Sequence, residues 1–305
     1  LRAVKDRVDK GEFFTIHKAR QNGKTTMLQA LAGYLQEQYA VVSLDFQRMS
    51  ALSFESEQHF VSAFAEELLY LIRELPEEIQ GQLRAFVEEK ARINSLPALF
   101  RVLSQWCGQS PKPLVLMIDE VDTATNNQVF LDFLSQLRAA YLSRDQLPTF
   151  QSVILAGVYD IRNMQRKIRP DQEHKQNSPW NIAAKFRVEM SFSTEEVANM
   201  LQEYEADYRT GMDVRQMADL IEQYTSGYPY LVSGLCKMLD EEIAGSTGFP
   251  TRSHAWTEEG FYEAEKKMVK EDNPLYESLL GKLKQYPELR TILYQLLFTG
   301  KTIPY

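Results

Sequence analysis

Short apolar runs alternate with longer segments of helical periodicity over most of this chain. The apolar runs predict strands at residues 12–16, 40–46, 114–119, 152–158 and 186–192. Several of these runs are rich in β-branched residues and apolar at consecutive positions, as in strands that are buried between two layers of helices. Between them, apolar residues recur at helical spacing, as at residues 27–35, and predict helices with one buried side. The pattern therefore predicts an α/β fold with a parallel, five-stranded sheet.

The periodicity changes at residue 193. Ser193 and Glu196 have the spacing of a capping box, which predicts that a helix begins there. Helical patterns follow, interrupted at residues 245–250 by the sequence GSTGFP, which is rich in turn-forming residues. The expected organisation is an α/β core at residues 1–192, a small helical module at 193–244, and a linker with a helical tail at 245–305. We expect three helices in the tail, within residues 256–298.

Composition narrows the class of protein. The chain has 305 residues, of which 44% are hydrophobic, which is enough for a core and excludes a disordered chain. Its 34 basic and 42 acidic side chains give a net charge of −8, which disfavours a surface that binds nucleic acid throughout. No run approaches the ~18–20 apolar residues of a membrane span, and the charged N-terminus is unlike a signal peptide. We therefore expect a soluble, cytoplasmic protein without a membrane partner.

The cysteines and the chain ends add two expectations. Cys107 and Cys236 lie far apart and neither belongs to a CxxC pair, so we expect neither a disulfide framework nor a cysteine zinc site. The chain opens without Met and stops at the sequence GKTIPY, which suggests a fragment of a longer protein.

The strongest chemical signal is Gly23-Lys24-Thr25-Thr26, which follows the first predicted strand and opens a predicted helix. Backbone N–H groups at such a helix start, together with the positive end of the helix dipole, favour a phosphate group. Lys24 is then expected to reach the β- and γ-phosphates of a nucleotide, the Thr25 hydroxyl to bind Mg²⁺, and Gly23 to allow a close approach of the backbone. The full phosphate-loop pattern has a glycine at position 18, where this chain has Lys18.

A second signal is the apolar strand at residues 114–119, which ends in two carboxylates, Asp119 and Glu120. This is a Walker B pattern. Asp119 is expected to hold Mg²⁺ through water, and Glu120 to orient or deprotonate the water that attacks the γ-phosphate. Kinases with phosphate loops need no such glutamate, because their nucleophile is a substrate oxygen. The pair therefore favours hydrolysis of ATP over transfer of its phosphate.

Three segments together resemble the AAA-like ATPases of the STAND branch, which include bacterial AAA-ATPase-like proteins: residues 19–26, residues 118–122, and Gly227-Tyr228-Pro229. The resemblance covers roughly residues 10–243. It implies a P-loop NTPase sheet of five strands in the order 5-1-4-3-2, with the helical module as a lid. It also implies that Gly227 and Pro229 contact the adenine side of the nucleotide.

The resemblance extends to the rest of the nucleotide site. Asn22 and Thr26 belong to the segment that is expected to bind the nucleotide, and Arg20 either contacts its oxygens or pairs with an acid of the lid. The resemblance implies an arginine near the fifth strand that reaches the nucleotide, often from a neighbouring subunit. The candidates are Arg162, Arg166, Arg169 and Arg187. Arg187 fits best by position.

Two further features bear on the resemblance. A polar side chain usually stands at the tip of the fourth strand, but residues 156–160 read AGVYD, without Asn, Ser or Thr at the tip. A winged-helix domain commonly follows the lid in related ATPases, and the tail suits its beginning.

Three functions stay open. The leading hypothesis is Mg²⁺-dependent ATP hydrolysis used as a conformational switch, which acts on an unknown protein or a C-terminal effector domain. Both a single chain and a homo-oligomer are compatible with this hypothesis. The second is a non-catalytic interaction module that is gated by nucleotide. The third is a DNA-stimulated ATPase, in which the basic segment at residues 160–176 meets phosphates.

Overall fold

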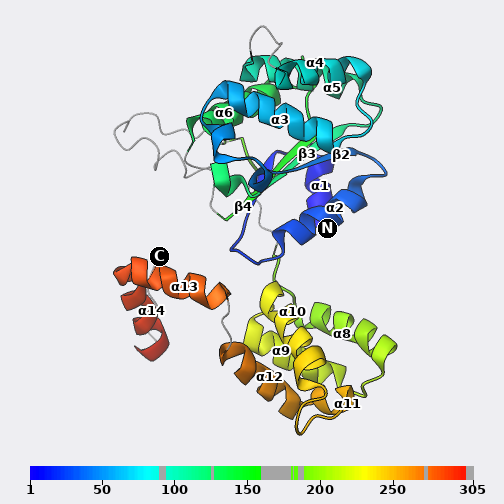
Figure 1. The fold of residues 1–305 in the computed structure, drawn as a ribbon. Helices are drawn as coiled ribbons and strands as arrows, with labels where there is room; N and C mark the ends of the chain where they lie inside the picture. The colour runs from blue at the N-terminus through cyan, green and yellow to red at the C-terminus, as the bar shows by residue number, and fades with distance from the viewer. Residues whose placement is uncertain are drawn as a thin grey trace. The chain divides into compact units, whose positions relative to one another are not determined.

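The computed structural model describes residues 1–88, 94–124, 127–158, 180, 182–184, 189–270 and 274–299 (Figure 1). Over these residues the chain folds into two compact units. The first comprises Leu1–Ala19 and Gly23–Glu189, and the second comprises Arg20–Asn22 and Met190–Tyr305. Each unit has an apolar core of its own, so each is described by itself.

A parallel sheet forms the centre of the first unit. Its strands are β1 (Phe14–His17), β2 (Ala40–Asp45), β3 (Leu114–Asp119) and β4 (Ser152–Gly157). Among the described residues they make a four-stranded sheet in the order β1-β4-β3-β2. In its register His17 lies opposite Gly157 and Asp45 lies opposite Asp119, so the carboxyl ends of the strands meet at one edge.

The prediction of a fifth strand at residues 186–192 is wrong for the described part of the chain. Residues 189–192 are not in a strand, and residues 185–188 lie outside the described residues. An isolated parallel bridge joins Phe14 to Ala184, on the edge of β1 that β4 leaves free. The sequence FRVEMSF at 186–192 alternates apolar and polar residues, so it offers only one apolar face, and an edge position offers only one neighbouring strand. Both features give weaker pairing than the central strands have.

Helices cover both faces of the sheet. They are α1 (Arg2–Asp9), α2 (Lys24–Leu35), α3 (Glu57–Leu71), α4 (Glu77–Val87), α5 (Leu96–Gln109) and α6 (Gln128–Leu142), with short 3₁₀ turns η1 (Phe46–Arg48), η2 (Ala51–Phe54) and η3 (Val121–Ala124). Helices α1 and α2 lie on one side of the sheet, and α3 to α6 lie on the other (Figure 1). The larger core lies beneath α3 to α6, where phenylalanine rings such as Phe60 and Phe133 pack with centroids 5.3 Å apart.

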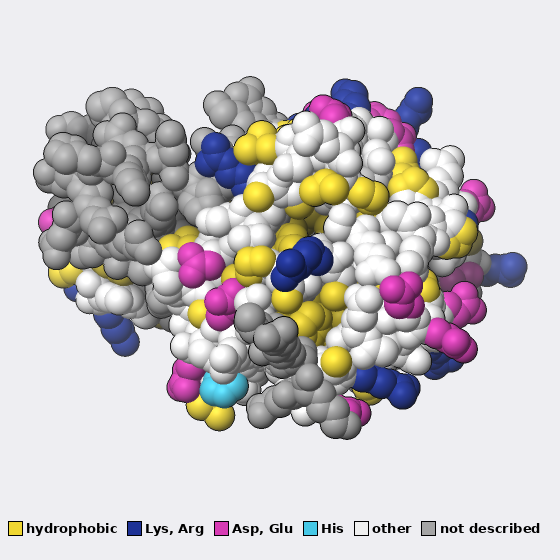
Figure 2. Space-filling model, turned by 90° about the horizontal axis from the view of Figure 1, so that it is seen from above, with side chains coloured by type: hydrophobic (Ala, Val, Ile, Leu, Met, Phe, Trp, Pro, Cys, Tyr) yellow, Lys and Arg dark blue, Asp and Glu magenta, His cyan; other side chains and the backbone are white. Residues whose placement is uncertain are grey.

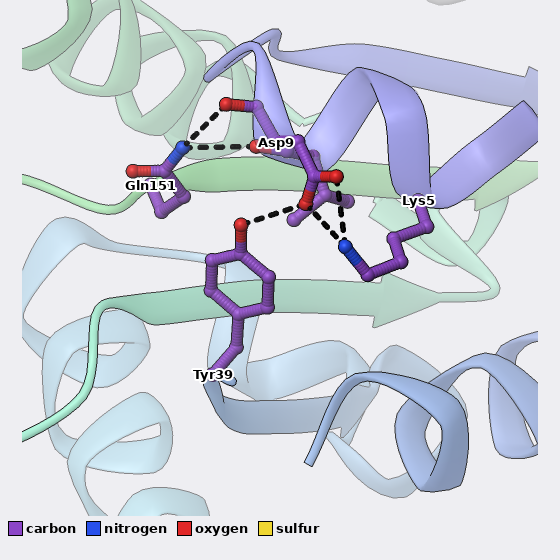
Figure 3. Close-up of polar contacts among 5 residues, drawn as sticks. Lys5, Asp9, Tyr39 and Gln151 are labelled. Atoms are coloured by element: carbon purple, nitrogen blue, oxygen red, sulfur yellow. Dashed lines mark hydrogen bonds and ion pairs between the residues drawn. The ribbon is translucent and has the colours of Figure 1, made fainter. Parts of the chain in front are cut away.

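The first helix, α1, was not expected from the sequence. Its buried side has only two residues, Val4 and Val8. Polar contacts at its C-terminal end join three parts of the first unit (Figure 3). The Asp9 carboxylate accepts hydrogen bonds from Lys5 Nζ and from Tyr39 Oη, both at 2.8 Å, and Gln151 Nε2 donates to the Asp9 carbonyl at 3.3 Å. These contacts fasten α1 to the segments that precede β2 and β4.

Helices build the second unit. They are α8 (Thr194–Tyr208), α9 (Val214–Thr225), α10 (Pro229–Met238), the π-helical turn η5 (Leu239–Ile243), α11 (Arg252–Ala255) and α12 (Glu258–Lys270). The predicted capping box is confirmed, because Ser193 Oγ accepts from the Glu196 N–H at 3.2 Å and the Glu196 carboxylate accepts from the Ser193 N–H at 2.9 Å. The apolar core of this unit runs from Val197 to Met268, so residues on both sides of the 245–250 segment contribute to it.

Two more helices, α13 (Pro274–Gln285) and α14 (Pro287–Thr299), complete the described chain. Together with α12 they occupy the region where the sequence predicts three helices. Residues 245–250 form a turn that is closed by an isolated antiparallel bridge between Ser246 and Phe249. Within the described segments, no helix is both long and apolar enough to cross a lipid bilayer.

Candidate functional site

The loop between β1 and α2 ends in a left-handed residue, Gly23, with φ at +71°. A positive φ favours glycine, because a side chain there meets its own backbone. The Gly23 carbonyl accepts the first bond of the helix from the Met27 N–H at 2.8 Å. Among the described residues, no carbonyl accepts from the backbone N–H groups of residues 23–26, as expected for the first turn of a helix. This end of α2 therefore offers a row of donors beside the edge where the strands end.

Lys24 is the first residue of α2, and its side chain is almost fully buried, at 5% exposure. Its Nζ atom donates to the carbonyls of Lys18 and Ala19 in the preceding loop, at 3.2 and 3.1 Å. The loop thus curls around the ammonium group and holds it with neutral acceptors. A charged phosphate oxygen makes a stronger, charge-assisted hydrogen bond, so these carbonyls can be exchanged for one.

Thr25 and Asp119 are in direct contact. The Thr25 hydroxyl donates to Asp119 Oδ2 at 2.5 Å, and the other carboxylate oxygen accepts from the Glu120 N–H at 2.9 Å. Asp119 is only 7% exposed. Thr26 is exposed on the same helical turn and makes no side-chain hydrogen bond among the described residues. A hydroxyl and a carboxylate oxygen that meet in this way form a donor set that suits Mg²⁺.

Glu120 stands just beyond β3 with an unusual backbone. Its φ of +51° is left-handed, which is uncommon for any residue other than glycine. The pKa of its carboxyl group is raised, first by burial and then by the negative charge of Asp119, whereas the Lys24 ammonium opposes the shift. A carboxylate with a raised pKa is a better acceptor for a proton from water.

The structure adds Asp122 to the site. This residue lies in the 118–122 segment that resembles the AAA-like ATPases, but the sequence alone assigned it no role. Its Oδ2 atom accepts a hydrogen bond from the Val158 N–H, immediately after β4. A Cβ atom on Gly157 would lie 3.0 Å from both carboxylate oxygens of Asp122. The sequence did contain one indication, because the tip of β4 lacks the polar side chain that usually stands there. In the structure the carboxylate of Asp122, from the neighbouring turn, lies at this tip.

A cavity of about 360 Å³ lies beside the Thr25–Asp119 contact, between α2, β2 and β3. Its polar lining comes from Thr25, Gln29, Ser43, Asp45, Arg48 and Asp119. Arg48 also pairs with Glu67 at 3.1 Å, so its charge is partly neutralised. Among the described residues, no group of three or more His, Cys, Asp or Glu residues has the arrangement of a metal site. Thr25 and Asp119 stay the predicted metal ligands on this edge, and they meet in a contact that is open to the cavity.

Gly227 has a structural reason to be glycine. Its φ is +66°, and a Cβ atom would lie 1.9 Å from the carbonyl oxygen of Phe192, whose N–H donates to the Gly227 carbonyl at 2.8 Å. Pro229 is the first residue of α10, where its missing N–H costs nothing. The sequence Gly-Tyr-Pro therefore serves the turn into α10, and its contact with adenine stays a prediction.

For the remaining predicted residues, a contact with the nucleotide stays a prediction. Arg20 and Asn22 lie in the short segment that is grouped with the second unit, so their nucleotide contacts also stay predictions. Arg187 and the other arginine candidates, Arg162, Arg166 and Arg169, lie outside the described residues, as does the basic segment at 160–176. On the face of the molecule in Figure 2, acidic and basic side chains are interspersed with apolar ones.

Several solved structures are similar to this chain. The chain is similar to the Aeropyrum pernix ORC1 protein in complex with DNA, at 12% identity and a TM-score of 0.48, over 88% of this chain and 64% of that one. It is similar to the ADP form of the A. pernix ORC2 protein, at 12% identity and a TM-score of 0.49, over 100% of this chain and 80% of that one. It is also similar to CDC6P from Pyrobaculum aerophilum, at 12% identity and a TM-score of 0.44, over 81% of this chain and 60% of that one.

The chain thus spans less than two thirds of the ORC1 and CDC6P chains. A comparison with curated proteins gives no match. The sequence matches the family described as "AAA-like domain" over residues 2–302, which is nearly its whole length. The chain therefore belongs to the AAA-like domain family, as the resemblance in its sequence implied.

Proposed function

We propose that the first unit binds ATP together with Mg²⁺ and hydrolyses it, and that the state of the nucleotide changes the conformation of the protein. The observation that carries this proposal is the contact of Thr25 with Asp119 at 2.5 Å. It joins the start of α2 to the end of β3, and these are the two residues that the sequence predicts as metal ligands. Lys24 and Glu120, their sequence neighbours, have the charges that phosphate binding and hydrolysis need.

Each of these residues has a separate role in the proposal. The N–H groups of residues 23–26 and the Lys24 ammonium bind phosphate oxygens. Thr25 and Asp119 separate enough to hold Mg²⁺, whose charge offsets that of the phosphates when it is bound. The buried position of Asp119 keeps its carboxylate in one orientation for this task.

Glu120 is the proton acceptor in this proposal. It orients a water molecule and takes its proton as the oxygen attacks the γ-phosphorus, so that ADP and phosphate are the products. Its raised pKa and its fixed, left-handed backbone support this role. An amide in its place can still hold water but cannot take the proton.

The test is phosphate release with Mg-ATP. The variant Glu120→Gln should bind the nucleotide as the parent does and hydrolyse it at least ~100-fold more slowly, because one proton acceptor is lost. Lys24→Ala should lose binding itself. The matched control is Glu66→Gln, an exposed glutamate on α3, which should leave both quantities unchanged. Hydrolysis by Glu120→Gln at the rate of the parent would refute the mechanism.

A second candidate is a module that binds nucleotide without turning it over. It is favoured by the tip of β4, which ends at Gly157 without a polar side chain to contact the nucleotide. It predicts tight, Lys24-dependent binding and no release of phosphate by the parent. The same assay therefore separates the two candidates.

The finer parts of the proposal concern residues on other segments. We infer that Gly227 and Pro229 border the adenine, that Arg20 and Asn22 flank the phosphates, and that Arg187 supplies a further positive charge. The same proposal includes the assignment to the STAND branch and a cytoplasmic location. It also includes an effector that responds to the nucleotide state. Nucleotide affinity of Arg187→Ala, measured with hydrolysis, tests whether this cation acts in binding or in turnover.

A further inference from the structure

The tip of β4 is bonded on both of its sides. On one side the Lys18 N–H, at the start of the loop that surrounds the Lys24 ammonium, donates to the Gly157 carbonyl at 3.2 Å. On the other side the Val158 N–H donates to the carboxylate of Asp122 in the η3 turn. Gly157, the last residue of β4, and Val158, which follows it, thus connect the Lys24 loop to the turn that follows β3. Glu120 lies directly before this turn, η3 (Val121–Ala124).

Glu120 depends on this turn for its orientation. Its left-handed backbone, with φ at +51°, costs about 1–2 kcal/mol for a residue with a side chain and persists only when its surroundings hold it. The Glu120 carbonyl accepts from the Thr123 N–H at 3.1 Å and from the Thr123 hydroxyl at 2.9 Å, which closes the turn. Val121, between Glu120 and Asp122, is fully buried. The turn is therefore fixed at Thr123 and Val121, and Asp122 fastens it to β4.

Space around Asp122 is also limited. A Cβ atom on Gly157 would lie 3.0 Å from each Asp122 carboxylate oxygen and 3.0 Å from Val121 Cγ2. A carbon this close to two oxygens forces one of the groups to move, so the absence of a side chain at position 157 is what admits the carboxylate. The smallest residue at the strand tip and a carboxylate on the turn are complementary.

We propose that Asp122 is a positioning residue that fastens the Glu120 turn to the tip of β4, and through it to the Lys24 loop. It does not touch the nucleotide. It keeps the carboxylate of Glu120 at a fixed place relative to the loop that binds the phosphates. The proposal rests on the proposed function, because it assigns the way in which the proton acceptor of that reaction is held.

The expected effect is on turnover rather than on binding. Misplacement of a reacting group by about 1 Å can cost ~100-fold in rate. Asp122→Ala should therefore lower kcat for Mg-ATP by about 10- to 100-fold and leave KM within about threefold of the parent. Asp122→Asn retains an oxygen that can accept from the Val158 N–H, so it should restore most of the lost rate.

The experiment measures phosphate release and, separately, the binding of Mg²⁺ with the non-hydrolysable analogue adenylyl imidodiphosphate. The variants are Asp122→Ala, Asp122→Asn, Gly157→Ala and the control Asp145→Ala, an exposed aspartate beyond α6 in the same unit. Gly157→Ala should lower kcat as Asp122→Ala does, because its methyl group displaces the same carboxylate. Asp145→Ala should behave as the parent in both assays.

The outcomes separate this proposal from the function on which it rests. If the parent and Glu120→Gln release phosphate equally, the proposed function fails and the positioning role falls with it. If Glu120→Gln is slow but Asp122→Ala and Gly157→Ala turn over as the parent, only the positioning role is overturned. If Asp122→Ala no longer binds the analogue, the binding and turnover of Asp122→Asn and Gly157→Ala are compared with those of the parent. The positioning role is overturned if these two variants also lose binding, and it is supported if they bind the analogue but turn over more slowly.

Discussion

Replacing Thr25 with valine tests the contact on which the site is built. The substitution keeps the shape of the side chain and removes the hydroxyl that donates to Asp119 Oδ2 at 2.5 Å. Asp119 is 7% exposed, and water in the cavity beside it can replace only part of the lost hydrogen bond. Its other oxygen already accepts from the Glu120 N–H at 2.9 Å, and this bond cannot serve both oxygens. The variant therefore leaves a mostly buried carboxylate oxygen without its protein donor.

The magnitude follows from the charge on the acceptor. Hydrogen bonds to charged groups contribute about 1.5–3 kcal/mol, and the cost is greatest when the partner stays buried and unsatisfied. We expect Thr25→Val to lower the free energy of unfolding of the first unit by about 1–2 kcal/mol in the absence of Mg²⁺ and nucleotide. A loss of this size changes the ratio of folded to unfolded protein by roughly 5- to 30-fold.

Urea unfolding with EDTA and without nucleotide measures this loss. In a Trp256→Phe background the two remaining tryptophans, Trp106 and Trp180, both belong to the core of the first unit, so their fluorescence reports on that unit. The matched control is Thr26→Val, the exposed neighbour on the same helical turn, which should lie within about 0.5 kcal/mol of the parent. Equal free energies of unfolding for Thr25→Val and Thr26→Val would refute the reasoning.

Other parts of the molecule give further predictions. Gly227→Ala should lower the free energy of unfolding of the second unit by about 3 kcal/mol or more, because its methyl group would lie 1.9 Å from a backbone carbonyl oxygen. The same urea midpoint for this unit in the variant and in the parent would contradict this. Cys107 and Cys236 should react slowly with iodoacetamide at pH 8 in the folded protein and quickly in urea, since burial raises the pKa of both thiols to about 12. Fast labelling of the folded protein would contradict these raised pKa values. The pKa of Tyr39 is raised to about 12, by burial first and then by its bond to Asp9, so its contribution to stability is complete below its usual pKa of 10.0 and is lost as the pH rises through about 12. The pKa of Asp9 is lowered, by Lys5 first and then by Tyr39, so its contribution to stability is present above its usual pKa of 3.8 and is lost as the pH falls through the lower, folded value. Tyr39→Phe should therefore make the free energy of unfolding depend less on pH at both the acidic and the alkaline end. An unchanged pH dependence would contradict this.

The central strands were predictable because burial on both faces leaves a clear pattern. The predicted strand at 114–119 has the observed bounds of β3, and it is buried at every position. The predictions for β1, β2 and β4 differ from the observed bounds by one or two residues at their ends. The 186–192 segment alternates apolar and polar residues, so its pattern resembled a strand, but its described residues, 189–192, are not in one. Helix α1 was not predicted, because its two buried valines are too few to form a recognisable apolar stripe.

The candidate site was predictable where one residue type has one chemical use. Lysine and threonine at a helix start, and an aspartate at a strand end, indicate phosphate and metal, and the structure brings Thr25 and Asp119 into contact. Asp122 was not predictable, because its role depends on how closely β4 approaches the turn after β3. The structural requirement for glycine at position 227 was hidden for the same reason, since it arises from a backbone carbonyl that lies far away in the sequence.

The balance of charge at the edge of the sheet determines what this site can bind. Burial raises the pKa of the Glu120 carboxyl group, and the carboxylates of Asp119, Asp122 and Asp45 raise it further, while Lys24 is the cation that opposes them. A free triphosphate would meet these carboxylates beside the Lys24 ammonium, and long-range attraction would not favour it because the chain itself carries a charge of −8. A divalent cation reverses this balance, because it neutralises the carboxylates and the phosphates together. On the proposed function, the acidic edge therefore selects a nucleotide that arrives with its metal, and it discriminates against a long polyanion that would have to meet the same carboxylates without one.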